Sequence, residues 1–164
     1  IDNLSTGIKS YIPEGVIFIE GDCQDPKVIA GLLDYEFEAI YHIAGQSSGE
    51  ISFEDPVYDL QTNGQSTLQL LDLARDIGCK KFIYASTMSI YGDTENLPAK
   101  ETIKSNPKSF YGVGKLASEH YLKIYNNITH LQRCLMEDKS SICENTKIKV
   151  KFLNNRYIYY RHAK

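Results

Sequence analysis

The sequence predicts a doubly wound α/β fold, in which helices pack against a parallel sheet. Three short apolar runs rich in β-branched and aromatic residues, at positions 15–22, 38–45 and 80–87, have the length and composition of buried strands. Helical patterns separate and follow them, and strands that alternate with helices form a parallel sheet. Each run is apolar throughout rather than alternately polar, so we expect helices on both faces of the sheet.

Three helices are expected along the same stretch. The first, at 25–34, opens with an Asp-Pro pair, in which the aspartate can cap the helix and the proline suits its first turn. The second, at 55–78, carries its leucines on one face and stops at Gly78. The third covers 109–125.

The composition changes near Tyr125. All eleven glycines lie at or before Gly114, and all five prolines lie at or before Pro107. A doubly wound fold normally uses glycine at its strand–helix turns, so the later residues do not read as a continuation of it. We therefore divide the chain into 1–127, a partial α/β domain, and an atypical tail at 128–164.

Length and charge limit the function. A chain of 164 residues with 42% hydrophobic side chains suits one domain with its own core. The net charge of −3, without a basic stripe, argues against a nucleic-acid partner. The sequence contains no run of 18 apolar residues, which is about the length that a membrane-spanning helix needs. The N-terminal sequence IDNLSTG lacks the charged and apolar regions of a signal peptide.

The cysteine and histidine spacings argue against a metal centre. The histidines form no metal-ligand spacing, and His42 lies beside an apolar run and is interpreted as structural. We expect reduced thiols in a cytoplasmic protein rather than zinc ligands or disulfides, because no Cys-x-x-Cys spacing occurs. The four cysteines are Cys23, Cys79, Cys134 and Cys143.

Polar residues follow each predicted strand. They are Asp22 after the first, the AGQSS stretch from Ala44 after the second, and the STMS stretch from Ser86 after the third. In open parallel sheets, ligands bind beyond the carboxyl ends of the strands. The sequence therefore predicts a ligand site at this edge.

A tyrosine precedes a lysine by four residues in the third helix, at Tyr111 and Lys115. This spacing puts both side chains on one helix face. A nearby ammonium favours the phenolate, so the pair could exchange a proton with a substrate alcohol, and Thr87 at a strand end could hold the same oxygen. The alternative is a surface pair, which is our interpretation of the equally spaced Tyr160 and Lys164 in the tail.

The motifs DNLSTG, EGDCQD, YHIAGQSSGEISFEDP, FIYASTMSIYGD and SFYGVGKLASEHYLKIY occur in the order found in one family. Over residues 1–125 the chain resembles the extended short-chain dehydrogenase/reductases, and above all their NAD-dependent nucleotide-sugar epimerases of the UDP-glucose 4-epimerase type. The resemblance implies a Rossmann domain with tightly bound NAD. It also implies a catalytic set of Thr87, Tyr111 and Lys115.

The resemblance implies further contacts to the cofactor. Asp2 resembles the acidic residue that bonds the adenosine ribose and disfavours a 2′-phosphate, although a turn or cap aspartate is the alternative. Asn63 resembles a helix asparagine near the nicotinamide, but Ser66 stands where the family has glycine. The complete set of cofactor-binding residues implied is Asp2, Asn3, Asp22, Cys23, Ala44, Gly45, Gln46, Asn63, Ser86, Tyr111 and Lys115, with no metal ligand.

The chain departs from the family at two places. The Gly-x-x-Gly-x-x-Gly turn that holds the pyrophosphate is absent, and so is the Leu-Arg-Phe-Asn-x-x-Gly segment that contacts substrate. We therefore expect a fragment that is itself inactive, and tight NAD binding only when the glycine turn is present.

The expected activity of the family member is epimerisation of a nucleotide-linked sugar through a keto intermediate, with Tyr111 as acid/base. A dehydratase of this family places Asp-Glu after the threonine, where this chain has Met88 and Ser89. The alternatives are a sugar-nucleotide reductase or dehydrogenase, or a non-catalytic binding module. The expected partners are a nucleotide sugar and a second copy of the chain in a homodimer.

Codons offer one explanation of the tail. Leu131-Gln132-Arg133 can be encoded by the codons CTT-CAA-CGT. If the same DNA is read in a frame shifted by one nucleotide, it begins TTC-AAC, which encodes Phe-Asn. The family carries Phe-Asn at this place, after its Leu-Arg. We predict that the tail is read out of frame and packs poorly, because it is rich in Lys and Asn without apolar periodicity. The alternatives are a divergent but genuine C-terminus and a chance coincidence of codons.

Overall fold

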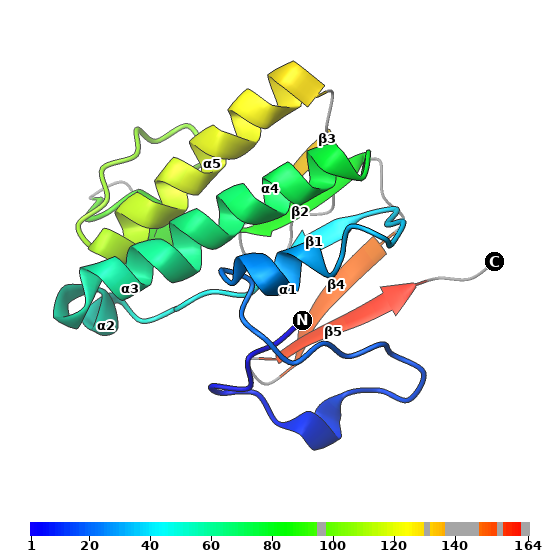
Figure 1. Ribbon diagram of the computed structural model, residues 1–164. Helices are drawn as coiled ribbons and strands as arrows, with labels where there is room; N and C mark the ends of the chain where they lie inside the picture. Colours follow the sequence, from blue (N-terminus) through cyan, green and yellow to red (C-terminus); the bar gives the residue numbers. More distant parts are fainter. Residues whose placement is uncertain (95–97, 130–131, 137–147, 154–155, 162–164) are drawn as a thin grey trace.

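A computed structural model describes residues 1–94, 98–129, 132–136, 148–153 and 156–161 (Figure 1). No helix in this described part is long and apolar enough to cross a membrane.

The centre of the fold is a parallel sheet of three strands in the order β1-β2-β3. These are β1 (Ile40–His42), β2 (Lys81–Ala85) and β3 (Gln132–Met136), and the register of β1 on β2 aligns Ile40 with Phe82. The predicted strands at 38–45 and 80–87 are therefore confirmed in their central residues. Among the described strands of this sheet, β2 alone has a partner on both edges.

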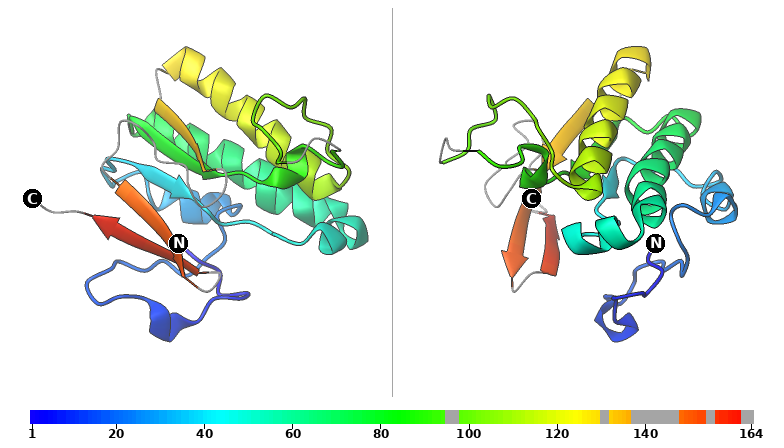
Figure 2. Two further views of the ribbon diagram at one scale, coloured as in Figure 1. Left: turned by 180° about the vertical axis from the view of Figure 1, so that it is seen from behind. Right: turned by 90° about the vertical axis from the view of Figure 1, so that its left-hand side faces the viewer.

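The helices lie on one face of the sheet, as the front and rear views show (Figures 1 and 2). The predicted fold class, a parallel sheet with helices packed on it, is confirmed, and in the described residues these helices cover one face of the sheet instead of the two that we expected. The three strands lie side by side in their order along the chain, so both connections move across the sheet in the same direction. Because such connections are right-handed, the helices that they contain, α4 and α5, lie on the same side of the sheet. The helical elements are α1 (Pro26–Ala30), α2 (Gly49–Glu54), α3 (Pro56–Leu60), η2 (Gln61–Gln65), α4 (Ser66–Asp76) and α5 (Phe110–Thr129), with short 3-10 turns at η1 (Lys9–Tyr11) and η3 (Met88–Ile90).

Local sequence accounts for where the helices begin and end. The Asp25 side chain accepts a hydrogen bond from the Lys27 N–H, which confirms the predicted cap of α1. Gly78 follows the second helical run with φ of +67°, a conformation that glycine adopts without strain. The run at 55–78 is not one uniform helix, because the π-helical turn η2 separates α3 from α4.

The apolar run at 15–22 does not form the predicted strand. Its sole pairing among the described residues is one parallel bridge between Asp2 and Glu20. Val16 and Ile17 are 54% and 73% exposed. An apolar run becomes a buried strand only when a neighbouring strand lies along it, and here a cavity of about 1460 Å³, lined by this N-terminal segment and by β1, lies beside it instead.

The hydrophobic core lies between the sheet and α4 and α5. Phe82 and Tyr84 of β2 are fully buried and pack with side chains from the helices. The helical part of this cluster comprises Leu70, Leu71, Leu73 and Ala74 from α4 and Leu122 from α5.

The described parts of the tail form two separate pairings. β3 extends the parallel sheet, with Lys81 opposite Gln132. β4 (Ile148–Leu153) and β5 (Arg156–Arg161) form an antiparallel hairpin of their own. The division at residue 127 and the out-of-frame reading of the tail stay predictions.

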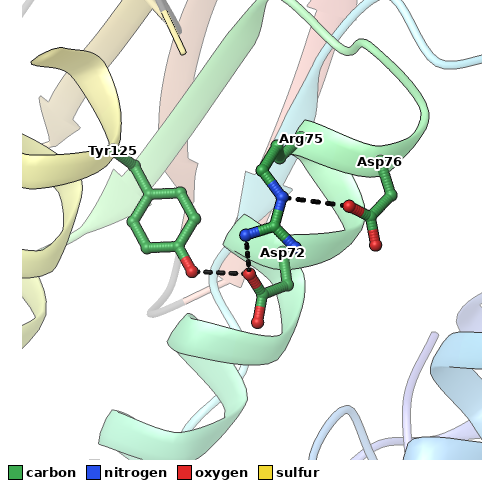
Figure 3. Close-up of polar contacts among 4 residues, drawn as sticks. All are labelled: Asp72, Arg75, Asp76 and Tyr125. Atoms are coloured by element: carbon green, nitrogen blue, oxygen red, sulfur yellow. Dashed lines mark hydrogen bonds and ion pairs between the residues drawn. The ribbon is translucent and has the colours of Figure 1, made fainter. Parts of the chain in front are cut away.

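A cluster of polar side chains joins the C-terminal halves of α4 and α5 (Figure 3). The Tyr125 hydroxyl of α5 donates to Asp72 Oδ1 of α4 at 2.6 Å, and Arg75 forms an ion pair with the same oxygen at 2.7 Å. Arg75 also donates through Nε to Asp76 at 3.0 Å. Burial and the adjacent Asp72 carboxylate raise the pKa of Tyr125 to about 12, so the phenol stays a donor at all ordinary pH values.

We expect Tyr125→Phe to lower the free energy of unfolding by about 1 kcal/mol, because it removes one hydrogen bond to a charged acceptor at a partly exposed site. Urea unfolding at pH 7 measures this loss. In a double-mutant cycle Tyr125 should couple to Asp72→Asn but only weakly to Asp76→Asn, since Asp76 does not bond the phenol. Equal coupling to both aspartates would contradict the assignment.

His42 is a buried histidine that gives the fold a second testable property. It is 2% exposed, its Nε2 is 2.9 Å from Thr67 Oγ1, and its Nδ1 has no hydrogen-bond partner in the described part of the chain. Burial, and to a smaller extent the charge of Lys115, lowers the pKa of His42 from 6.5 to about 3. The sequence-based interpretation of His42 as structural agrees with this environment.

We expect the chain to lose stability as the pH falls from about 6.5 to about 3, because the unfolded state binds a proton on His42 that the folded state excludes. Unfolding free energies measured across this range should fall less steeply for His42→Gln than for the wild type. The matched control His120→Gln, at an exposed position on α5, should keep the wild-type slope. Identical slopes for wild type and His42→Gln would contradict this expectation.

Candidate active site

The candidate site lies beyond the carboxyl end of β2, where the strand passes into η3 and meets the start of α5. Thr87 lies two residues after the end of the strand, and its side chain accepts from the Ser89 N–H at 3.2 Å and so caps η3. Gly112 of α5 packs closely against this turn, since a Cβ there would lie 2.7 Å from the Ser89 carbonyl oxygen. This close approach brings the helix that carries Tyr111 to the segment that carries Thr87.

Lys115 is buried at the same place. Its side chain is 5% exposed, and Nζ donates to the carbonyl oxygen of Ala85, the last residue of β2, at 3.2 Å. Nζ lies 4.9 Å from the ring centre of Tyr84 and 5.8 Å from that of Tyr111. The predicted neighbours Tyr111 and Lys115 thus lie close together on α5, and Lys115 reaches the last residue of β2.

Burial sets the charge of Lys115. It lowers the pKa of the ammonium from 10.5 to about 8, while the carboxylate of Asp59 and, more weakly, Cys23 act in the opposite direction. At neutral pH the group therefore carries a proton, but holds it less firmly than an exposed lysine does.

Asn63 occupies the π-helical turn and is fully buried. Its Nδ2 donates to the Gln46 carbonyl oxygen and to Asp59 Oδ1, both at 3.0 Å. Its Oδ1 has no hydrogen-bond partner among the residues that the structure describes. A Cβ on Gly45 would lie 2.4 Å from this oxygen and 3.5 Å from Lys115 Nζ, so the glycine lets the loop after β1 reach both groups. π-helical turns are frequent at functional sites, and this one presents an unpaired buried acceptor.

Two buried acidic residues were not predicted from the sequence. Asp59 of α3 is 1% exposed and accepts hydrogen bonds from two side-chain amides. Glu119 of α5 is also buried and accepts from the Ser86 hydroxyl. The i,i+4 spacing of Asp59 to Asn63, and of Lys115 to Glu119, was the available signal, since residues so spaced share a helix face.

The remaining predicted residues line the cavity beside β1. Its walls include the seven residues Asp2, Asn3, Asp22, Cys23, Ala44, Gly45 and Gln46. Five predicted residues are not among the cavity walls, namely Asn63, Ser86, Thr87, Tyr111 and Lys115. Asn63 and Lys115 lie next to Gly45, which is a cavity wall, and Lys115 also reaches the end of β2. The structure thus divides the predicted set into a cavity group and a strand-end group that meet at Gly45.

The far end of the cavity is polar. Asn3 Nδ2 donates to Asp22 Oδ2 at 3.0 Å, and Asp2 Oδ1 accepts from the Leu4 N–H at 2.7 Å. Asp2 therefore forms the turn that was the alternative interpretation, and its contact with a ribose stays a prediction. Cys23 beside them is buried, which raises the pKa of its thiol. Among the described residues, no group of three or more His, Cys, Asp or Glu side chains could hold a metal ion.

The chain is similar to known proteins in sequence and in fold. The family model described as GDP-mannose 4,6 dehydratase matches residues 1–149. The UDP-glucose 4-epimerase of Mycolicibacterium smegmatis is 35% identical over 115 residues, which are 70% of this chain and 37% of that protein.

Two solved structures are similar over most of the chain. The UDP-glucose 4-epimerase of Thermus thermophilus, in complex with NAD, has a TM-score of 0.78 and 36% identity. The enzyme of Thermotoga maritima with UDP-glucose has a TM-score of 0.79 and 31% identity. Each comparison covers 83% of this chain and 45% of the other, so the chain spans less than half the length of these relatives. The chain belongs to the extended short-chain dehydrogenase/reductases, in the family that the GDP-mannose 4,6 dehydratase model describes.

Proposed function

We propose that this chain is the cofactor-binding and catalytic part of an NAD-dependent epimerase of nucleotide-linked sugars. The observation that carries the proposal is the buried Lys115, whose Nζ donates to the carbonyl oxygen at the end of β2 and lies 5.8 Å from the ring centre of Tyr111, while Thr87 lies two residues after the same strand. Similar proteins of known structure are described as UDP-glucose 4-epimerases, which supports the same reaction here.

In the proposed reaction Tyr111 removes and returns the proton of a sugar hydroxyl. Lys115 keeps the phenol acidic through its charge, and its own position is fixed by the Ala85 carbonyl. Thr87 donates a hydrogen bond to the oxygen that becomes a carbonyl in the keto intermediate. The sugar then turns over and is reduced from its other face, with Tyr111 as the acid.

The residues present suit the adenosine and nicotinamide ends of NAD, which when bound accepts hydride from the sugar carbon and returns it. Asp2 and Asn3 would hold the ribose hydroxyls at the polar end of the cavity, with Asp22 and Cys23 beside the base. Gly45, with φ of +153° and no Cβ, would let the loop backbone approach the cofactor closely. Ala44, Gln46, Asn63 and Ser86 complete the proposed contacts.

The residues after Thr87 favour epimerisation over elimination of water. Met88 is 53% exposed and Ser89 exchanges hydrogen bonds with Thr87, so neither supplies a carboxyl group to protonate a leaving hydroxyl. A dehydratase needs an acid and a base at this place in addition to the tyrosine. The name of the matching family model therefore does not extend to the reaction proposed for this chain.

A chimera tests the reaction directly. Residues 1–127 would replace the matching segment of the Thermus thermophilus epimerase, and the exchange of UDP-glucose and UDP-galactose would be followed by proton NMR. We expect activity in the chimera, and a loss of about 100-fold or more for Tyr111→Phe, because general acid–base catalysis contributes factors of this size. The control Tyr121→Phe, on the same helix but in the core cluster, should stay active. A Tyr111→Phe chimera with near-normal turnover would contradict the proposal.

Cofactor choice tests the role of Asp2. A carboxylate at the ribose repels a 2′-phosphate, so the chimera should bind NAD more tightly than NADP, by about tenfold or more. Calorimetry should show this preference reduced in Asp2→Asn and unchanged in Asp34→Asn, an exposed control. Equal preferences in Asp2→Asn and the parent chimera would mean that Asp2 only closes its turn.

A further inference from the structure

Asp59 is a buried carboxylate for which the proposed reaction has no use. It lies on α3, is 1% exposed, and forms no ion pair with a described cation. Removing a carboxylate from water is costly unless hydrogen bonds or a nearby charge compensate for it. The surroundings of Asp59 should therefore show what the charge is for.

Two amide groups compensate the carboxylate, and both belong to the candidate site. Gln46 Nε2 donates to Asp59 Oδ1 at 2.8 Å, and Asn63 Nδ2 donates to the same oxygen at 3.0 Å. Each amide is also tied to the loop after β1, because Gln46 Nε2 donates to the Ser48 carbonyl at 2.7 Å and Asn63 Nδ2 donates to the Gln46 carbonyl at 3.0 Å. The carboxylate thus closes a ring of hydrogen bonds that fixes the loop to the π-helical turn.

The other carboxylate oxygen faces the helix that carries Lys115. A Cβ on Gly114 would lie 3.5 Å from Asp59 Oδ2, so α5 passes the carboxylate closely. The two charges affect each other: Asp59 raises the pKa of Lys115, and Lys115 lowers that of Asp59, although burial acts more strongly on each. Lys115 is also faced by the rings of Tyr84 and Tyr111, by Cys23 and by the neutral His42, so Asp59 is the described carboxylate that acts on it most.

We propose that Asp59 is a positioning residue, which locks the Gly45–Gln46 loop onto Asn63 and supplies the negative charge that balances the buried Lys115 ammonium. The proposal rests on the function proposed above, because it assigns Asp59 to the site that performs that reaction. A carboxylate with a purely structural role would hold the loop but leave the charge of Lys115 unchanged. The titration of Lys115 therefore separates the two roles.

The test uses the present chain, labelled with carbon-13, and NMR titration of the Lys115 Cε resonance. In Asp59→Asn the titration midpoint of Lys115 should move below the wild-type value, because an ammonium that loses a nearby negative charge gives up its proton more readily. The matched control Asp76→Asn, an exposed aspartate at the end of α4, should leave the midpoint in place. An unchanged Lys115 midpoint in folded Asp59→Asn would overturn the proposal.

A second measurement needs no substitution. In the wild type the side-chain amide signals of Gln46 and Asn63 should shift with the same midpoint as the Asp59 carboxyl carbon, since both amides donate to it. Amide signals that do not follow Asp59 would also overturn the proposal, even if Asp59→Asn fails to fold.

Neither measurement requires cofactor or substrate. If the chimera described above is inactive, the proposed function fails while the NMR result still decides the role of Asp59. If the chimera is active, its Asp59→Asn variant should lose turnover, kcat, with little change in KM, and its pH–rate profile should shift with the Lys115 midpoint.

Discussion

The hydrogen bond from the Lys115 ammonium to the Ala85 carbonyl fixes the geometry on which the rest of the site depends. It joins α5 to the last residue of the central strand and buries a charge there. A buried ammonium is costly, and the fold compensates with a carbonyl dipole, the faces of two tyrosine rings and the carboxylate of Asp59. These groups come from three elements, so the site forms only when β2, α3 and α5 pack together.

The elements predicted well from the sequence are those specified by local signals. The strands around Tyr41 and Ile83 are short apolar runs between turn residues, and α1 begins at its Asp-Pro pair as predicted. The run at 15–22 carried the same local signal and failed, because burial of a strand also requires a neighbour, which a local pattern cannot reveal. The π-helical turn was equally invisible, since its sequence continues the helical period of the residues around it.

The candidate site shows the same division. Ordered motifs indicated the Tyr111–Lys115 pair and the seven cavity residues, and the structure brings these into two adjoining groups. Asp59 and Glu119 were missed because each is notable only for being buried, and burial depends on tertiary packing. Their roles follow from the residues that they contact, Gln46 and Asn63 for one and Ser86 for the other.

The open edge of β1 has a consequence for how the chain behaves in solution. Within the described parts of the chain β1 pairs with β2 alone, and the residues of β1 line the cavity. The N–H and C=O groups along such an edge can accept a strand from any source, including another copy of the same chain, and this is the usual origin of edge-to-edge aggregation. Concentration should therefore matter more for this chain than its net charge of −3 suggests. A strand paired with this edge of β1 would block it as a site of aggregation. It would also add a wall to the cavity, besides those formed by the N-terminal segment and β1.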